Sequence, residues 1–119
     1  MFGAIACDPV VDLHIVNDTP YPVDIVVFNV NVSSTSVSGQ YIDSFLELQP
    51  GELSTFKSCT FCLVPPDHTV SKRFIGNERT EFLVAAVAAY QVAGAERHEL
   101  LFRKIVTGED VEIKIVDLR

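Results

Sequence analysis

Three cysteines and three histidines are the residues of this 119-residue chain whose side chains could do more than pack. Two of the cysteines, Cys59 and Cys62, have the Cys-x-x-Cys spacing found in dithiol redox centres, zinc half-sites and short disulfide loops. Pro65 and Pro66 follow the pair closely and exclude the helix that a thioredoxin-type Cys-x-x-Cys pair would begin. A structural zinc site needs four ligands, and His68 is the nearby candidate for a third. The alternatives are therefore a disulfide, free buried thiols, or metal or redox chemistry.

The remaining cysteine follows small residues near the start of the chain, in Ala4-Ile5-Ala6-Cys7-Asp8. This stretch resembles a bacterial lipoprotein box, in which the cysteine is acylated. A signal peptide needs a charged start and an apolar stretch of about 7–15 residues, and the few residues before Cys7 carry no charge. Either the numbering begins inside a longer precursor and Cys7 carries lipid, or Cys7 is a small buried thiol.

The composition excludes several classes of function. Hydrophobic residues make up 48% of the chain and charged residues 21%, which is typical of a globular domain. Nine basic residues stand against sixteen acidic ones, and the net charge of −7 argues against nucleic acid as a partner. P-loop, GxGxxG and GxSxG motifs are absent, and the histidines are dispersed. We therefore expect no enzyme, no catalytic residues, no metal or other cofactor and no small-molecule substrate. The alternatives are a thiol redox or metal-binding domain that uses Cys59 and Cys62, and an adhesion or interaction module with an unrelated partner.

Apolar patterns along the chain predict β-strands. Strands are expected at residues 11–16, 23–32, 53–61, 80–93, 98–106 and 111–115. Residues 82–90 are apolar without the one-sided stripe of a surface helix, so a strand covered on both faces explains them better. Residues 41–48 are ambiguous between helix and strand, and residues 65–77 look like a long connection with a short extended piece around Phe74.

Clusters of Gly, Pro, Asn and Asp separate these segments. Turns are expected at residues 17–22, 49–52, 94–97 and 107–110. About seven to eight strands without a helix between them predict an all-β chain, an antiparallel β-sandwich of the kind that immunoglobulin-like domains form. We expect residues 1–10 to form a tether and residues 11–119 to form one sandwich domain.

Three short motifs follow one another along the chain. Pro22-Val23-Asp24-Ile25-Val26-Val27 opens the second strand, Pro50-Gly51-Glu52 is a turn before a strand, and Ala88-Ala89-Tyr90 leads into the last two strands. In this order they resemble the outer-membrane lipoproteins of type VI secretion systems, the TssJ family. The resemblance covers most of the chain, and it implies a transthyretin-like sandwich.

The same resemblance implies a location and a partner. The location is the periplasmic face of the outer membrane, with a lipid on Cys7 as the membrane anchor, although Asp8 makes the inner membrane possible. The partner is the periplasmic part of an inner-membrane secretion component, contacted by the loop between the first two strands. On this chain the loop residues are Asp18, Thr19, Pro20 and Tyr21. Tyr21 lies between two prolines that hold its backbone extended, so it suits recognition, or alternatively covers the end of the sandwich.

Overall fold

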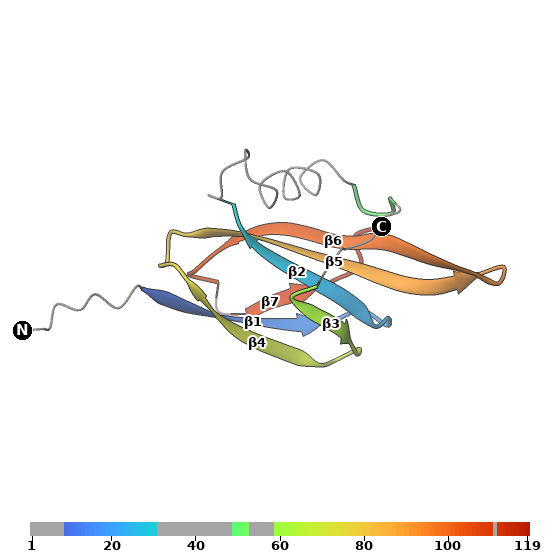
Figure 1. Ribbon diagram of the computed structural model, residues 1–119, viewed down its shortest axis with the longest axis horizontal. Coiled ribbons are helices and arrows are strands. Elements are labelled where there is room, and N and C mark those ends of the chain that lie inside the picture. Colours follow the sequence, from blue (N-terminus) through green and yellow to red (C-terminus); the bar gives the residue numbers. More distant parts are fainter. Residues whose placement is uncertain (1–8, 31–48, 53–58, 111) are drawn as a thin grey trace, which may run out of the picture.

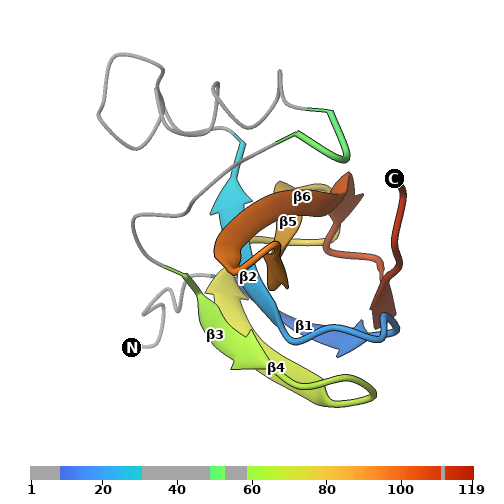
Figure 2. The ribbon, with the colours of Figure 1, turned by 90° about the vertical axis from the view of Figure 1, so that its right-hand side faces the viewer.

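Seven β-strands in two sheets make up the part of the chain that the computed structural model describes, which is residues 9–30, 49–52, 59–110 and 112–119. The strands are β1 (Val10–Asn17), β2 (Val23–Asn29), β3 (Phe61–Val64), β4 (Thr69–Ile75), β5 (Glu81–Val92), β6 (Ala95–Thr107) and β7 (Glu112–Ile115). One sheet has the order β4-β1-β7 and the other β3-β2-β5-β6 (Figure 1). The end-on view in Figure 2 shows the two sheets as facing layers. The predicted β-sandwich is confirmed.

The first strand is the centre of the smaller sheet. β1 pairs antiparallel with β4, from Val10 opposite Ile75 to Val16 opposite Thr69. On its other side β1 pairs parallel with β7, ending at Asn17 opposite Ile115. The other neighbouring strands described in the two sheets are antiparallel. Strands from the start and the end of the chain therefore lie side by side.

Alternation along the strands produces the main core between the sheets. Side chains two residues apart point to the same face of a strand, which turns Leu13 and Ile15 of β1 toward the facing sheet. The buried residues of this cluster are Leu13, Ile15, Val23, Ile25, Val27, Val64, Phe82, Val84, Ala86, Ala88, Leu101, Phe102, Val106, Ile113 and Ile115. Each large aliphatic side chain buried here stabilises the fold by about 1.5–3 kcal/mol.

Residues 82–88 of β5 are buried on both faces of the strand, as the uniform apolar run predicts. Phe82, Val84, Ala86 and Ala88 point into the main core. The residues between them join a second buried cluster on the other face of the sheet, made of Val26, Leu83, Ala85, Val87 and Leu100. A strand with two apolar faces has no polar side to expose, which explains why its sequence lacks a period.

A β-bulge in β6 determines which of the two buried clusters its side chains join. Ala86 pairs with Phe102 and Val87 pairs with Leu100, so Leu101 is an extra residue in β6. The inserted residue lets two consecutive side chains, Leu101 and Phe102, both join the main core, while Leu100 joins the second cluster.

β4 corrects one expectation. Residues 69–75 form a regular strand, where the sequence predicts a connection with a short extended piece around Phe74. Val70, Lys72 and Phe74 lie on the same face of the strand, and the charged Lys72 interrupts the apolar alternation that would have predicted a strand. As an edge strand β4 keeps Lys72 at the surface, with its Nζ 5.8 Å from the centre of the Phe74 ring.

Other boundaries also differ from the predicted ones. β3 begins at Phe61, where the predicted strand 53–61 ends, and β2 ends at Asn29, within the predicted strand 23–32. The β5–β6 turn is Ala93-Gly94 rather than residues 94–97, and both of its residues have positive φ, 51° and 81°. The ambiguous segment 41–48 and residues 53–58 lie outside the described residues.

Two predicted turns are confirmed. In the turn at 49–52, the backbone N–H of Glu52 donates to the carbonyl oxygen of Gln49 at 3.0 Å, and Gly51 supplies the positive φ of 94° that the turn requires. At the other turn, Asp110 N–H donates to the carbonyl oxygen of Thr107 at 3.0 Å.

Candidate functional site

One buried amide holds the loop between β1 and β2. Asn17, fully buried at the end of β1, donates from Nδ2 to the carbonyl oxygens of Tyr21 at 2.7 Å and Val64 at 3.0 Å. Its Oδ1 accepts from the backbone N–H of Thr19 at 3.1 Å and from the Thr19 hydroxyl at 2.7 Å. Both donor and both acceptor positions of the amide are therefore used. The loop is fixed, because another conformation would leave these buried polar atoms unpaired.

Two further segments meet this loop, and we call the region the β1–β2 end. The β3–β4 turn reaches it, since Asn17 N–H donates to the His68 carbonyl oxygen at 3.0 Å and Asp67 N–H donates to the Asn17 carbonyl oxygen at 2.8 Å. The end of β7 reaches it through the Asp18 N–H, which donates to the Ile115 carbonyl oxygen at 2.9 Å. The backbone of the loop is thus tied to both of its neighbours.

The four loop residues expected to bind a partner differ in exposure. Asp18 and Pro20 are exposed, whereas Thr19 is only 4% exposed and uses its hydroxyl inside the loop. Tyr21 is half-buried and packs against the main core. A partner at this end can therefore reach Asp18, Pro20 and part of Tyr21, while Thr19 shapes the loop.

The C-terminal residue covers the Tyr21 ring. The Arg119 guanidinium carbon lies 5.4 Å from the ring centre, a cation–π distance. Its Nη2 lies 2.8 Å from Asp117 Oδ2 and its Nη1 lies 3.0 Å from Glu99 Oε2. The side-chain hydrogen bond between Arg119 and Asp117 lowers the pKa of Asp117 and raises the pKa of Arg119. The Arg119–Glu99 ion pair holds Arg119 against β6.

The Cys-x-x-Cys pair lies at the start of the edge strand β3. Cys59 and Cys62 are joined by a disulfide, with their Cα atoms 5.4 Å apart. His68, the candidate third ligand, is exposed in the β3–β4 turn, and its Nδ1 is 3.0 Å from the Pro66 carbonyl oxygen. Within the described residues, the group that could surround a metal ion contains the two cysteines but not His68.

Asp24 is the residue that sequence reasoning missed. Val23 pairs with Val64 and Ile25 pairs with Phe61, so Asp24 of β2 lies opposite a bulge formed by Cys62 and Leu63. One carboxylate oxygen of Asp24 and both Sγ atoms lie within 4.8 Å of one another. The available signal was one acidic residue in the apolar run 22–27, but only the strand register connects it to the cysteines.

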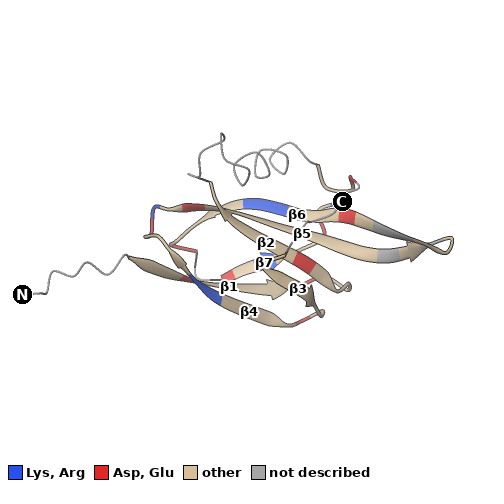
Figure 3. Cartoon of the chain, in the orientation of Figure 1, with Lys and Arg blue, Asp and Glu red and all other residues tan. Residues whose placement is uncertain are grey.

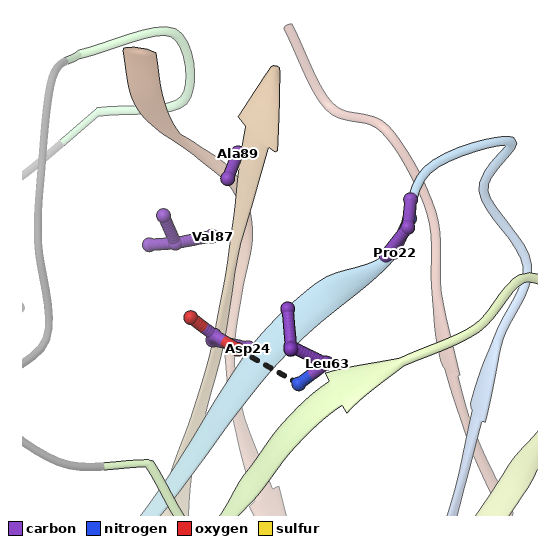
Figure 4. A pocket seen from close by; sticks show the side chains of 5 residues that line it. All are labelled: Pro22, Asp24, Leu63, Val87 and Ala89. Atoms are coloured by element: carbon purple, nitrogen blue, oxygen red, sulfur yellow. Dashed lines mark hydrogen bonds between the residues drawn. The ribbon is translucent and has the colours of Figure 1, made fainter. Parts of the chain in front are cut away.

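A hollow of about 220 Å³ lies beside this cluster, lined by Pro22, Asp24, Leu63, Val87 and Ala89 (Figure 4). Leu63 is 68% exposed and has a positive φ of 50°, a conformation that costs a non-glycine residue about 1–2 kcal/mol. Its N–H donates to Asp24 Oδ1 at 2.8 Å, and Figure 4 shows the other oxygen of Asp24 directed away from Leu63. The site therefore combines an exposed apolar side chain with a carboxylate.

The candidate lipid-bearing residue Cys7 and its neighbour Asp8 lie outside the described residues. Within the part of the chain that is described, no helix has the length and apolar character needed to cross a membrane. Comparison of the chain with protein-family models, with curated proteins and with solved structures gives no match.

Proposed function

We propose that this chain is a non-enzymatic docking subunit that binds a protein partner through its β1–β2 end. The observation that carries the proposal is the rigid loop at this end, held by Asn17, beside the exposed side chain of Leu63. A loop that is already fixed loses little conformational freedom on binding, so its contacts contribute more of their energy to affinity.

The chemistry of this end indicates the partner's chemistry. Asp18 and Asp67 are exposed there, Asp24 lines the hollow, and Leu63 and Pro22 supply apolar surface. Figure 3 shows the longer stretches of Lys and Arg along the chain elsewhere, on β4 and β6. Arg119, which lies over the Tyr21 ring, is paired with Asp117 and Glu99. A partner segment that carries basic side chains around an apolar one complements this surface, because complementary charge favours encounter and the apolar anchor slows dissociation.

The resemblance to TssJ lipoproteins supports one identity for that partner. That partner is the periplasmic part of an inner-membrane component of a type VI secretion system. In this arrangement a lipid on Cys7 holds the present chain near the outer membrane. The direction of β1 suits this arrangement. β1 starts near Pro9, whose carbonyl oxygen accepts from Gly76 N–H at 2.8 Å, and its eight residues run to the β1–β2 end. At about 3.3 Å per residue, the docking surface is about 25 Å from the tethered end.

Leu63→Asn in the full chain tests the docking surface. Asparagine adopts positive φ more readily than leucine, so we expect the melting temperature to stay the same or rise. Loss of the apolar side chain should raise the Kd for the purified periplasmic domain of the inner-membrane component by about tenfold or more. Asp18→Lys should weaken binding as well, and biolayer interferometry measures both.

Ile75→Thr is the matched control for this experiment. Ile75 is 66% exposed, close to the value for Leu63, but it lies at the opposite end of the sandwich beside Val10. Its substitution should leave the Kd unchanged. Wild-type affinity in both Leu63→Asn and Asp18→Lys, with folding intact, would show that the partner does not bind at the β1–β2 end.

A further inference from the structure

At the edge of the larger sheet, the pairing of β3 with β2 places two sulfurs and a carboxylate together. One oxygen of Asp24 and the Sγ atoms of Cys59 and Cys62 all lie within 4.8 Å of one another. Cys62 is exposed, and the other two residues are half-buried. Thiolate and carboxylate groups are zinc ligands, and a Cys-x-x-Cys pair supplies half of many structural zinc sites.

Backbone hydrogen bonds hold the cluster in place. Thr60, between the two cysteines, donates from its N–H to the Ile25 carbonyl oxygen at 2.8 Å, and its hydroxyl accepts from Val27 N–H at 3.0 Å. Asp24 is oriented by the Leu63 N–H at 2.8 Å. The turn that carries the cysteines is therefore attached to the strand that carries the carboxylate, and this attachment does not depend on the disulfide.

We propose that the reduced form of this cluster binds one thiophilic divalent cation, Zn²⁺ or Cd²⁺, through Cys59, Cys62 and Asp24. Zinc–sulfur bonds are about 2.3 Å and zinc–oxygen bonds about 2.0–2.2 Å, so tetrahedral ligand atoms stand roughly 3.5 Å apart. The Asp24 oxygen lies within 4.8 Å of both sulfurs, and once the Cys59–Cys62 bond is reduced, rotation about the cysteine Cα–Cβ bonds moves the sulfurs apart toward that spacing. Three protein ligands leave the fourth position of the ion for water.

Binding requires that the disulfide is reduced first. Two molecules of a small thiol, RSH, give two electrons and two protons to the Cys59–Cys62 bond and leave as RSSR. The ion then displaces the two thiol protons. Exposure of Cys62 gives the thiol access to a sulfur. The disulfide closes a loop with a sequence separation of only 3, the kind of loop whose cross-link stabilises a fold least.

Cadmium titration tests the site without any partner protein, so its outcome is separate from that of the docking experiment. The full chain carries Cys7→Ser to remove the third thiol and is reduced with a phosphine. We expect a cadmium–thiolate absorption band that saturates at one ion per chain, and no band in the oxidised chain. Cys59→Ser or Cys62→Ser should abolish the band at the same cadmium concentration.

Asp24→Asn tests the third ligand. Its amide oxygen can still accept from the Leu63 N–H, so the fold is retained, but the anionic ligand is lost. We expect the Kd for Cd²⁺ to rise by about tenfold or more, since even outer-shell partners are worth that much. Asp67→Asn, at an exposed position of the β3–β4 turn, should leave the Kd unchanged. An Asp24→Asn chain that binds as tightly as its parent, or a reduced parent without a saturable band, overturns the proposal.

Discussion

At the scale of single residues, Asn17 determines the shape of the β1–β2 loop. The sequence identifies the Asn, Asp and Pro residues of segment 17–22 as turn formers, and that prediction is independent of tertiary structure. What the sequence does not show is that the Asn17 amide is buried, with Val64 of another strand as one of its partners. The amide thus links the loop to both sheets.

Replacing Asn17 with alanine should therefore be costly. Asn17→Ala leaves the Tyr21 and Val64 carbonyl oxygens and the Thr19 hydroxyl without this partner in a buried place. We expect the free energy of unfolding to fall by about 3 kcal/mol, measured by urea denaturation.

Asn77→Ala is the control for this prediction. The Oδ1 of Asn77 accepts from the Arg79 N–H at 2.8 Å in the exposed β4–β5 loop, where water can replace a lost partner. Its cost should be about 1 kcal/mol or less. Equal losses in the two variants would mean that burial of Asn17 contributes nothing to stability.

At the scale of elements, sequence pattern predicts buried strands better than edge strands. β5 is predicted because its apolar run needs cover on both faces. β4 is missed because an edge strand in solvent tolerates Lys72 in its alternation. The β5–β6 hairpin is predicted, but its turn is displaced, because Ala93 carries no turn signal although it adopts a positive φ.

The hairpin turn should be improved by a residue that suits its backbone. Two-residue hairpin turns with positive φ at both positions prefer Asn-Gly, and this chain has Ala93-Gly94. Ala93→Asn should raise the free energy of unfolding by about 0.5–1 kcal/mol, measured by thermal or urea unfolding. Ala95→Asn, placed at the start of β6, should not stabilise, and a gain there equal to that at Ala93 would refute the explanation from turn geometry.

At the scale of the whole molecule, the layered architecture is predictable and the Asp24 cluster is not. Alternation and turn spacing define facing sheets, because each strand has to bury its apolar face. The neighbours of a strand within a sheet depend on register, which the sequence does not encode locally. For that reason Cys59 and Cys62 are found as a pair, whereas Asp24 is found only through the register of β2 against β3.

The ion pair between Asp117 and Arg119 makes the stability of the fold depend on pH. The hydrogen bond from Arg119 lowers the folded-state pKa of Asp117 from its ordinary value of 3.8. A lowered carboxyl pKa contributes stability above the unfolded-state value and loses it as the pH falls through the folded-state value. We therefore expect wild type to be more stable than Asp117→Asn above about pH 5, with the difference shrinking toward zero in stronger acid.

Urea denaturation at several pH values measures this difference. Glu109→Gln, in the exposed β6–β7 turn, serves as the control for the loss of one carboxylate. A difference between wild type and Asp117→Asn that stays constant down to strong acid would show that the ion pair does not stabilise the fold.

The parallel pairing of β1 with β7 has a mechanical consequence. In the proposed arrangement, tension between a membrane anchor before β1 and a partner held at the far end would act along the length of β1. That strand is bonded on one side to β4 and on the other to β7, so the pull shears two ladders at once instead of peeling them open bond by bond. Such an arrangement suits a link that must stay intact while the surfaces it joins are drawn apart.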